Sequence, residues 1–122
     1  MQPEAAVREF CQAFARQDVE ELLGWFTDDA VYHNIPLPPA EGRAAIEATL
    51  RQFVGPGGEA EFEIRNLAVV GNVVLTERID RLTMAGKPVV LPVMGAFEVT
   101  PQGKIRAWRD YFDMGQLMKQ VG

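Results

Sequence analysis

The chain has 122 residues, of which 48% are hydrophobic and 24% are charged, and its formal net charge is −5. This length predicts one domain over residues 1–122, with room for a hydrophobic core and a pocket. The acidic balance argues against a nucleic acid or an anionic membrane surface as a partner. No apolar run approaches the ~20 residues that cross a bilayer, and no signal-peptide pattern is visible, so we expect a soluble, cytoplasmic protein.

The first part of the chain predicts two helices. Apolar residues recur at helical spacing over residues 3–16, which predicts the first helix. The lone cysteine, Cys11, is expected on this helix as a small buried residue in a reducing compartment. Asp18 fits the cap of a second, short helix, because a glutamate follows three residues later. We expect this second segment to include Phe26 and to end at residues 28–29.

A strand, a loop and a third helix follow. Residues 30–34 predict a short strand. The loop over residues 36–42 is expected to have no regular structure, because its three prolines remove backbone donors. Residues 43–54 predict a helix, which the glycines of residues 55–58 would end.

The second half of the chain predicts β-structure. The expected strands cover residues 62–70, 73–84, 89–99 and 105–112, joined by short turns, and a final helix covers residues 115–121. Helices followed by a meander of antiparallel strands define the α+β class. A long curved antiparallel sheet packed with N-terminal helices makes a cone, and the interior of a cone can hold a small molecule.

Two of these strands carry carboxylates on an otherwise apolar face, because side chains two residues apart in a strand share a face. In the strand over residues 73–84, one face holds Val74, Thr76, Arg78, Asp80 and Leu82. In the strand over residues 105–112, one face holds Arg106, Trp108, Asp110 and Phe112. Arg78 is placed to bridge Asp80 to Asp110 if the strands come close. An ion cluster solvated at a sheet edge is an equally compatible interpretation of this pattern.

The remaining chemistry-bearing residues carry less information. Tyr32 and Asn34 share a face of their strand, whereas His33 points away, so we expect His33 at the surface or in an interface rather than as a catalytic base. One histidine and one cysteine leave no zinc site, and no metal is expected. No nucleotide-binding or serine-hydrolase motif is present. Four methionines are expected mainly to fill the core: Met84, Met94, Met114 and Met118.

Three stretches of the chain resemble the limonene-1,2-epoxide hydrolases. They read YHNIPLPPAEGRAAIEATL from residue 32, TERIDRL from residue 76 and MGAFEVTPQGKIRAWRDYFD from residue 94. The similarity extends over nearly the whole chain. The resemblance implies the cone-shaped α+β fold shared with nuclear transport factor 2 and ketosteroid isomerase. It also implies a homodimer and an active site that needs no cofactor.

The resemblance implies a role for each residue of the motifs. Asp110 would be the base that activates water, and Tyr32 and Asn34 would hold that water. Asp80 would be the acid that protonates the epoxide oxygen, and Arg78 would bridge the two carboxylates. The product would be a vicinal diol, formed from a small, mostly apolar, cyclic or terpenoid epoxide without a covalent intermediate. By alignment, the pocket would be lined by Phe53, Leu82, Leu91, Val93, Phe112 and Leu117.

Two other functions are compatible with the same fold. In an isomerase or dehydratase, Asp110 would remove a carbon-bound proton; the intact Tyr32 and Asn34 pair, which suits a bound water, argues against it. In a non-catalytic small-ligand binding or dimerisation module, the charged residues would have no task. Burying such a cluster in an apolar cone lowers the stability of the fold and has no evident structural benefit, which argues against that interpretation. Arg109 and Asp113 face away from Asp110, and we assign them no catalytic role.

Overall fold

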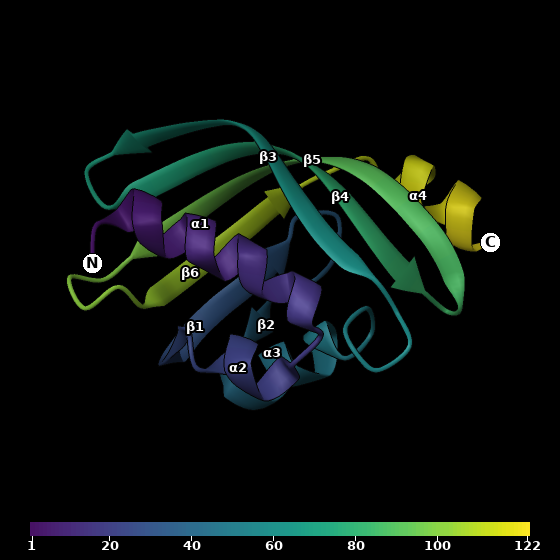
Figure 1. Cartoon of the computed structure of the whole chain (residues 1–122), viewed down its shortest axis with the longest axis horizontal. Helices are drawn as coiled ribbons and strands as arrows, with labels where there is room; N and C mark the ends of the chain where they lie inside the picture. Colours follow the sequence, from purple (N-terminus) through teal and green to yellow (C-terminus); the bar gives the residue numbers. More distant parts are fainter.

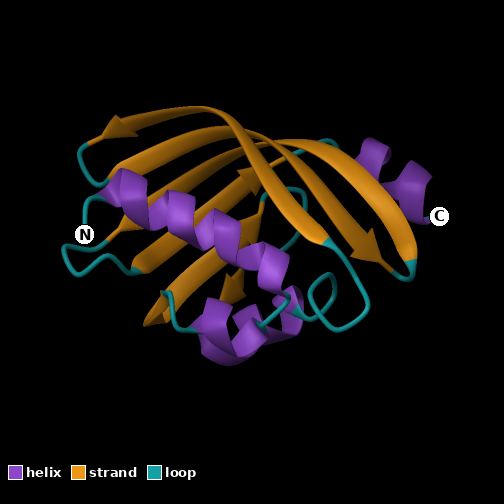
Figure 2. Ribbon diagram, viewed as in Figure 1, coloured by secondary structure: helices purple, strands orange, loops and turns teal.

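In the computed structural model, which describes residues 1–122, six strands form one curved sheet and helices cover its inner face (Figures 1 and 2). The helices are α1 (Pro3–Ala13), the 3-10 helix η1 (Phe14–Arg16), α2 (Val19–Leu23), α3 (Arg43–Leu50) and α4 (Met114–Val121). The strands are β1 (Phe26–Asn34), β2 (Ala40–Glu41), β3 (Ala60–Val70), β4 (Val73–Met84), β5 (Lys87–Val99) and β6 (Ile105–Tyr111). The α+β class predicted from the sequence is confirmed.

The strand order across the sheet is β2-β1-β6-β5-β4-β3. Strands β3 to β6 form the expected antiparallel meander, whereas β1 pairs with β6 in parallel. The parallel pair departs from the purely antiparallel sheet that the sequence predicts. It joins segments far apart in the chain, so no local hairpin signal marks it. Its register sets Tyr32 opposite Trp108 and Asn34 opposite Asp110.

The second helix is shorter than predicted. Asp18 caps it as expected, since its side chain accepts a hydrogen bond from the backbone N–H of Glu21. The helix ends at Leu23, however, and residues 28–29 lie within β1, which already begins at Phe26. The loop over residues 36–42 likewise contains the two-residue strand β2, and α3 ends at Leu50 rather than at residue 54.

β-bulges in β3 and β6 change which side chains point toward the inner face of the sheet. In β3, Ile64 pairs with Arg78 and Asn66 with Glu77, so Arg65 is the extra residue. In β6, Val99 pairs with Ile105 and Glu98 with Ala107, which leaves Arg106 without a partner. A bulge of one residue reverses the alternation on one side of it. Arg106 therefore lies exposed and pairs with Glu98 on the outer face, and its predicted place beside Trp108 is wrong.

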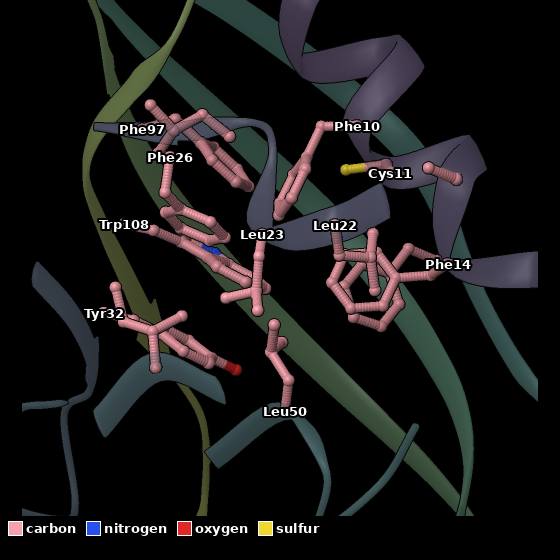
Figure 3. Packing of buried hydrophobic residues seen from close by; sticks show 14 of the residues in the cluster. Phe10, Cys11, Phe14, Leu22, Leu23, Phe26, Tyr32, Leu50, Phe97 and Trp108 are labelled. Atoms are coloured by element: carbon pink, nitrogen blue, oxygen red, sulfur yellow. The ribbon is translucent and has the colours of Figure 1, made fainter. Parts of the chain in front are cut away.

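The hydrophobic core lies between α1 and the inner face of the sheet (Figure 3). The ring of Phe10 meets Phe14, Phe26 and Trp108 edge to face, with centroids 5.1 to 5.4 Å apart. Such edge-to-face pairs add to the stabilisation from buried area. Cys11 is buried as expected, and its burial raises the pKa of the thiol to about 12.

The methionines do not all fill the core. Met94 and Met118 are 53% and 52% exposed, because they project from the outer face of β5 and from the solvent side of α4. Met84 packs against the core and Met114 against a second, smaller apolar cluster around Leu117. None of the helices is long and apolar enough to span a bilayer.

Candidate active site

Three buried charged side chains meet on the inner face of the sheet. Arg78 and Asp80 come from β4, and Asp110 comes from β6. Alternation along β4 turns Thr76, Arg78 and Asp80 inward, as the sequence predicts, and their residues are 0 to 3% exposed. The solvated ion cluster that the sequence left open is therefore excluded, and the cost of burying these charges must be offset by hydrogen bonds.

Arg78 uses all five of its N–H groups. Nε and Nη2 donate to the two carboxylate oxygens of Asp80 at 2.9 and 2.8 Å. Nη1 and Nη2 donate to the two oxygens of Asp110 at 3.1 and 2.8 Å. The fifth N–H, on Nη1, donates to Oγ1 of Thr76 at 3.1 Å. One planar guanidinium thus holds both carboxylates in a fixed geometry.

Asp110 accepts a third hydrogen bond, from the indole of Trp108. The Nε1 to Oδ1 distance is 2.7 Å. Oδ1 therefore accepts from both Trp108 and Arg78, whereas Oδ2 accepts from Arg78 alone. Because each carboxylate oxygen has two acceptor positions, Oδ2 keeps one of them free.

The parallel pairing of β1 with β6 brings Tyr32 and Asn34 to the carboxylates. The ring of Tyr32 stacks on that of Trp108, with centroids 4.0 Å apart and planes at 6°. Asn34 lies opposite Asp110. Burial, and then the charge of Asp110, raise the pKa of Tyr32 well above its usual value, so the phenol stays protonated and can donate a hydrogen bond.

Burial shapes the protonation of the charged cluster. It raises the pKa of Asp80 to about 6, with Arg78 opposing the shift and Asp110 adding to it. Burial alone would lower the pKa of Arg78, but the charges of Asp110 and Asp80 outweigh it and the net shift is upward. The positive charge of Arg78 offsets only one of the two carboxylate charges, and the remaining negative charge favours a proton on the buried Asp80.

A cavity of about 60 Å³ opens beside this cluster. That volume holds several water molecules. The five predicted motif residues divide into two groups: Tyr32, Asn34, Asp80 and Asp110 line the cavity, and Arg78 lies behind the carboxylates. The cavity is also lined by all six residues expected as its apolar wall: Phe53, Leu82, Leu91, Val93, Phe112 and Leu117.

Sequence reasoning missed several residues of the site. Trp108 and Thr76 were placed on the correct faces without a role, although a buried indole N–H needs an acceptor, which is a signal for Trp108. Five further residues line the cavity: Leu37, Thr49, Gln52, Phe62 and Met84. His33 contacts the carbonyl of Leu37 and does not line the cavity. No group of three or more His, Cys, Asp and Glu side chains is placed to hold a metal ion.

The geometry defines a class of protein. A carboxylate with a free acceptor and a second carboxylate that binds a proton near pH 6 stand together at the end of an apolar cavity. Such a pair suits an enzyme that moves protons in both directions during one reaction. The curved sheet supplies the two carboxylates from β4 and β6, which flank β5 on either side.

Comparison with known proteins identifies the family. Residues 1–122 match the family model for the limonene-1,2-epoxide hydrolase catalytic domain. The chain is 35% identical over 114 residues to epoxide hydrolase EphG of Mycobacterium tuberculosis (strain ATCC 25618 / H37Rv), covering 93% of this chain and 75% of that protein. The chain therefore belongs to the limonene-1,2-epoxide hydrolase family and is an epoxide hydrolase.

Solved structures agree with this assignment. A limonene-epoxide-hydrolase-like epoxide hydrolase from M. tuberculosis superposes with a TM-score of 0.80 at 33% identity, covering 94% of this chain and 85% of that one. The epoxide hydrolase/cyclase-like enzyme SalBIII gives a TM-score of 0.82 at 22% identity, over 93% and 92% of the two chains. A putative SnoaL-like polyketide cyclase from Shewanella denitrificans OS-217 gives 0.81 at 16% identity, over 98% and 96%. The last two show the shared fold only.

Proposed function

We propose that this epoxide hydrolase adds water in one step to a small, mostly apolar epoxide and releases a vicinal diol. Asp110 is the base, Asp80 is the acid, and Tyr32 and Asn34 position the water. The observation that carries the proposal is the double bridge of Arg78, which holds both carboxylates at the end of one apolar cavity. The two proton transfers that epoxide opening needs are thereby placed side by side.

The hydrogen bonds of Asp110 indicate which of its two oxygens would take the proton of the water. Because Oδ1 already accepts two hydrogen bonds, the water would donate to Oδ2. The phenol of Tyr32 and the amide of Asn34 lie on the strand next to Asp110 and line the same cavity. They can orient the lone pair of the water toward the epoxide carbon.

Asp80 supplies the second proton. Its pKa of about 6 means that a useful fraction of the protein carries this proton near neutral pH, where an ordinary aspartate would not. As the carbon–oxygen bond of the epoxide breaks, the leaving oxygen takes the proton of Asp80 and becomes a hydroxyl. The attacking water becomes the second hydroxyl of the diol.

The site must then return its proton from Asp110 to Asp80. The Oδ2 atoms of both residues accept from the same atom, Nη2 of Arg78, at 2.8 Å each. A single water or product hydroxyl between these two oxygens is enough to carry the proton. No covalent bond to the protein forms at any stage, because ring strain already activates the epoxide carbon.

The apolar wall supports a hydrophobic substrate. Ten of the 15 residues around the cavity are hydrophobic, which favours a cyclic or terpenoid epoxide over a highly polar one. Water excluded by such walls cannot screen the carboxylates, so their effect on the reacting atoms is strengthened.

The test uses cyclohexene oxide and limonene oxide with three variants. Diol formation by the wild type, with a loss of at least about a hundredfold in both Asp110→Asn and Asp80→Asn, supports the proposal. Asp28→Asn is the matched control, because this carboxylate is 99% exposed on β1 and should leave the rate unchanged. Full activity in either folded site variant, or no diol from the wild type, contradicts it.

The homodimer of the family is also a proposal for this chain. It is supported by apolar side chains on the outer face of the sheet, where Leu75, Val90, Met94 and Tyr111 are 42 to 53% exposed. Monomeric proteins rarely leave a contiguous apolar surface open to water. Sedimentation velocity should give a dimer for the wild type and a monomer for Met94→Glu, and a monomeric wild type would refute it.

A further inference from the structure

Gly95 lies in the middle of β5, behind the charged cluster. In the register of the sheet it stands between Thr76 on β4 and Asp110 on β6. It is buried, and it does not line the cavity. Glycine weakens a strand, so its presence in the centre of a sheet often marks a close approach of other groups.

The missing side chain of Gly95 leaves the space in which the guanidinium lies. A Cβ atom at this position would overlap Nη1 of Arg78. It would also stand 2.7 Å from Oδ1 of Asp110 and 2.9 Å from Oγ1 of Thr76. These three atoms are the partners in the two hydrogen bonds that Nη1 donates. Even an alanine must therefore displace this end of the bridge.

We propose that Gly95 and Thr76 are positioning residues for the reaction: Gly95 provides the space for Nη1 of Arg78, and Thr76 provides its second acceptor. This inference rests on the proposed roles of Arg78 and Asp110. Neither residue is needed to contact the substrate, since neither lines the cavity. Both act by holding Arg78 against Asp110.

The geometry separates the two ends of the bridge. Both bonds to Asp80 come from Nε and Nη2 and do not involve Nη1, whereas one of the two bonds to Asp110 comes from Nη1 and the other from Nη2. Crowding at Gly95 would therefore weaken the Nη1 bond to Oδ1 of Asp110 while sparing both bonds to Asp80. The balance of charge on Asp80 then changes, because Arg78 lowers its proton affinity and Asp110 raises it.

The first variant is Gly95→Ala, compared with Gly55→Ala. An added Cβ at Gly55 has no atom within 4 Å, so the same chemical change is made there without crowding. For Gly95→Ala we expect kcat to fall by about a hundredfold, the loss typical of a misplaced catalytic group. KM should change by less than about twofold, because the cavity walls are intact. Gly55→Ala should match the wild type.

A second readout does not depend on turnover. The side-chain carboxyl carbon of Asp80, followed by ¹³C NMR against pH, should titrate at a different pH in Gly95→Ala than in the wild type and in Gly55→Ala. A folded Gly95→Ala protein with wild-type kcat and wild-type titration would overturn the proposal. A shifted titration in a protein whose wild type forms no diol would instead support the role of Gly95 and refute the proposed function.

Thr76→Val covers the case in which Gly95→Ala does not fold. Valine has nearly the shape of threonine and only removes the acceptor of Nη1. We expect kcat to fall by about tenfold with KM unchanged, together with a shift in the titration of the Asp80 carboxyl group. A folded Thr76→Val protein in which kcat, KM and the titration all equal those of the wild type would overturn the proposal.

Discussion

Trp108 holds the proposed base from the same strand: its indole Nε1 lies 2.7 Å from Oδ1 of Asp110, two residues further along β6. The ring of Trp108 is also part of the hydrophobic core. The ring of Trp108 packs against Phe10 of α1 and stacks on Tyr32 of β1. One buried ring therefore links the packing of α1 to the orientation of Asp110 and Tyr32, and damage to the core at this ring should be visible in catalysis.

Trp108→Phe tests this link. Phenylalanine keeps an aromatic ring for the stack but cannot donate to Asp110. Loss of a hydrogen bond to a charged group costs about 1.5–3 kcal/mol, so we expect the free energy of unfolding in urea to fall by at least that amount. We also expect kcat to fall by about tenfold, because Asp110 loses one of its three donors.

Trp25→Phe is the control for Trp108→Phe. Trp25 also packs against Phe10, with centroids 6.2 Å apart, but it does not line the cavity. It should lose some stability without a loss of kcat. Equal kcat values in Trp108→Phe and the wild type would show that the indole donor has no part in catalysis.

The raised pKa of Asp80 predicts how stability depends on pH. In the folded protein this pKa is about 6, against an ordinary value of 3.8 for an aspartate. Between these pH values the folded protein binds a proton that the unfolded chain has lost, so the free energy of unfolding falls as pH rises. The shift corresponds to about 3 kcal/mol. Asp80→Asn cannot titrate, so the stability of the wild type relative to this variant should fall by about that amount from pH 4 to pH 7.

Urea denaturation at several pH values measures this difference. Three surface glutamates have lowered pKa values because of arginine partners, and they oppose the effect of Asp80. They are Glu21, Glu63 and Glu98, and they are present in both proteins, so their contribution cancels in the difference. A relative stability that is constant with pH, or that rises, would contradict the raised pKa of Asp80.

From the hydrogen bonds of Gln120 we predict that α4 takes part in substrate binding. Its side-chain amide accepts from the backbone N–H of Val90 at 2.7 Å and donates to the Val90 carbonyl at 2.9 Å, which ties α4 to the free edge of β5. Leu117 of the same helix lines the cavity. Gln120→Leu removes both bonds, worth about 1 kcal/mol each, and should raise KM about fivefold by loosening this wall.

Steady-state kinetics with one epoxide decides this prediction. We expect kcat to change by less than about twofold, because the charged cluster lies on other elements. Gln116→Leu makes the same change at an exposed position of α4 and should leave both constants unaltered. A fall in kcat with no change in KM would show that α4 does not act as a wall of the cavity.

Strand alternation predicted the inward faces of β1, β4 and β6 at the site from the sequence alone. It placed Tyr32 with Asn34, Arg78 with Asp80, and Asp110 apart from Arg109, and the structure confirms each of these placements. Alternation works there because each residue pair lies within one regular stretch of strand. The roles came from the resemblance of the motifs to a known family, which alternation alone does not provide.

The features that were missed depend on partners far away in the chain. Arg106 was placed on the wrong face because a bulge at that residue reverses the alternation, and no glycine or proline marks it. Two further features join segments that are far apart in the chain, and no local sequence pattern marks either of them. They are the parallel register of β1 with β6 and the hydrogen bonds between Gln120 and Val90. Gly95 has no sequence signal of its own, because its importance lies in a volume that Arg78 occupies.

The origin of the new oxygen atom in the diol tests the central claim most directly. Enzyme in excess over epoxide is mixed in oxygen-18 water, so that each molecule turns over at most once, and the diol is examined by mass spectrometry. Direct attack by the water that Asp110 activates predicts one heavy oxygen in every diol from this first turnover. A first-turnover diol whose new oxygen is light must have taken it from a carboxylate of the protein, and that result would contradict the one-step mechanism.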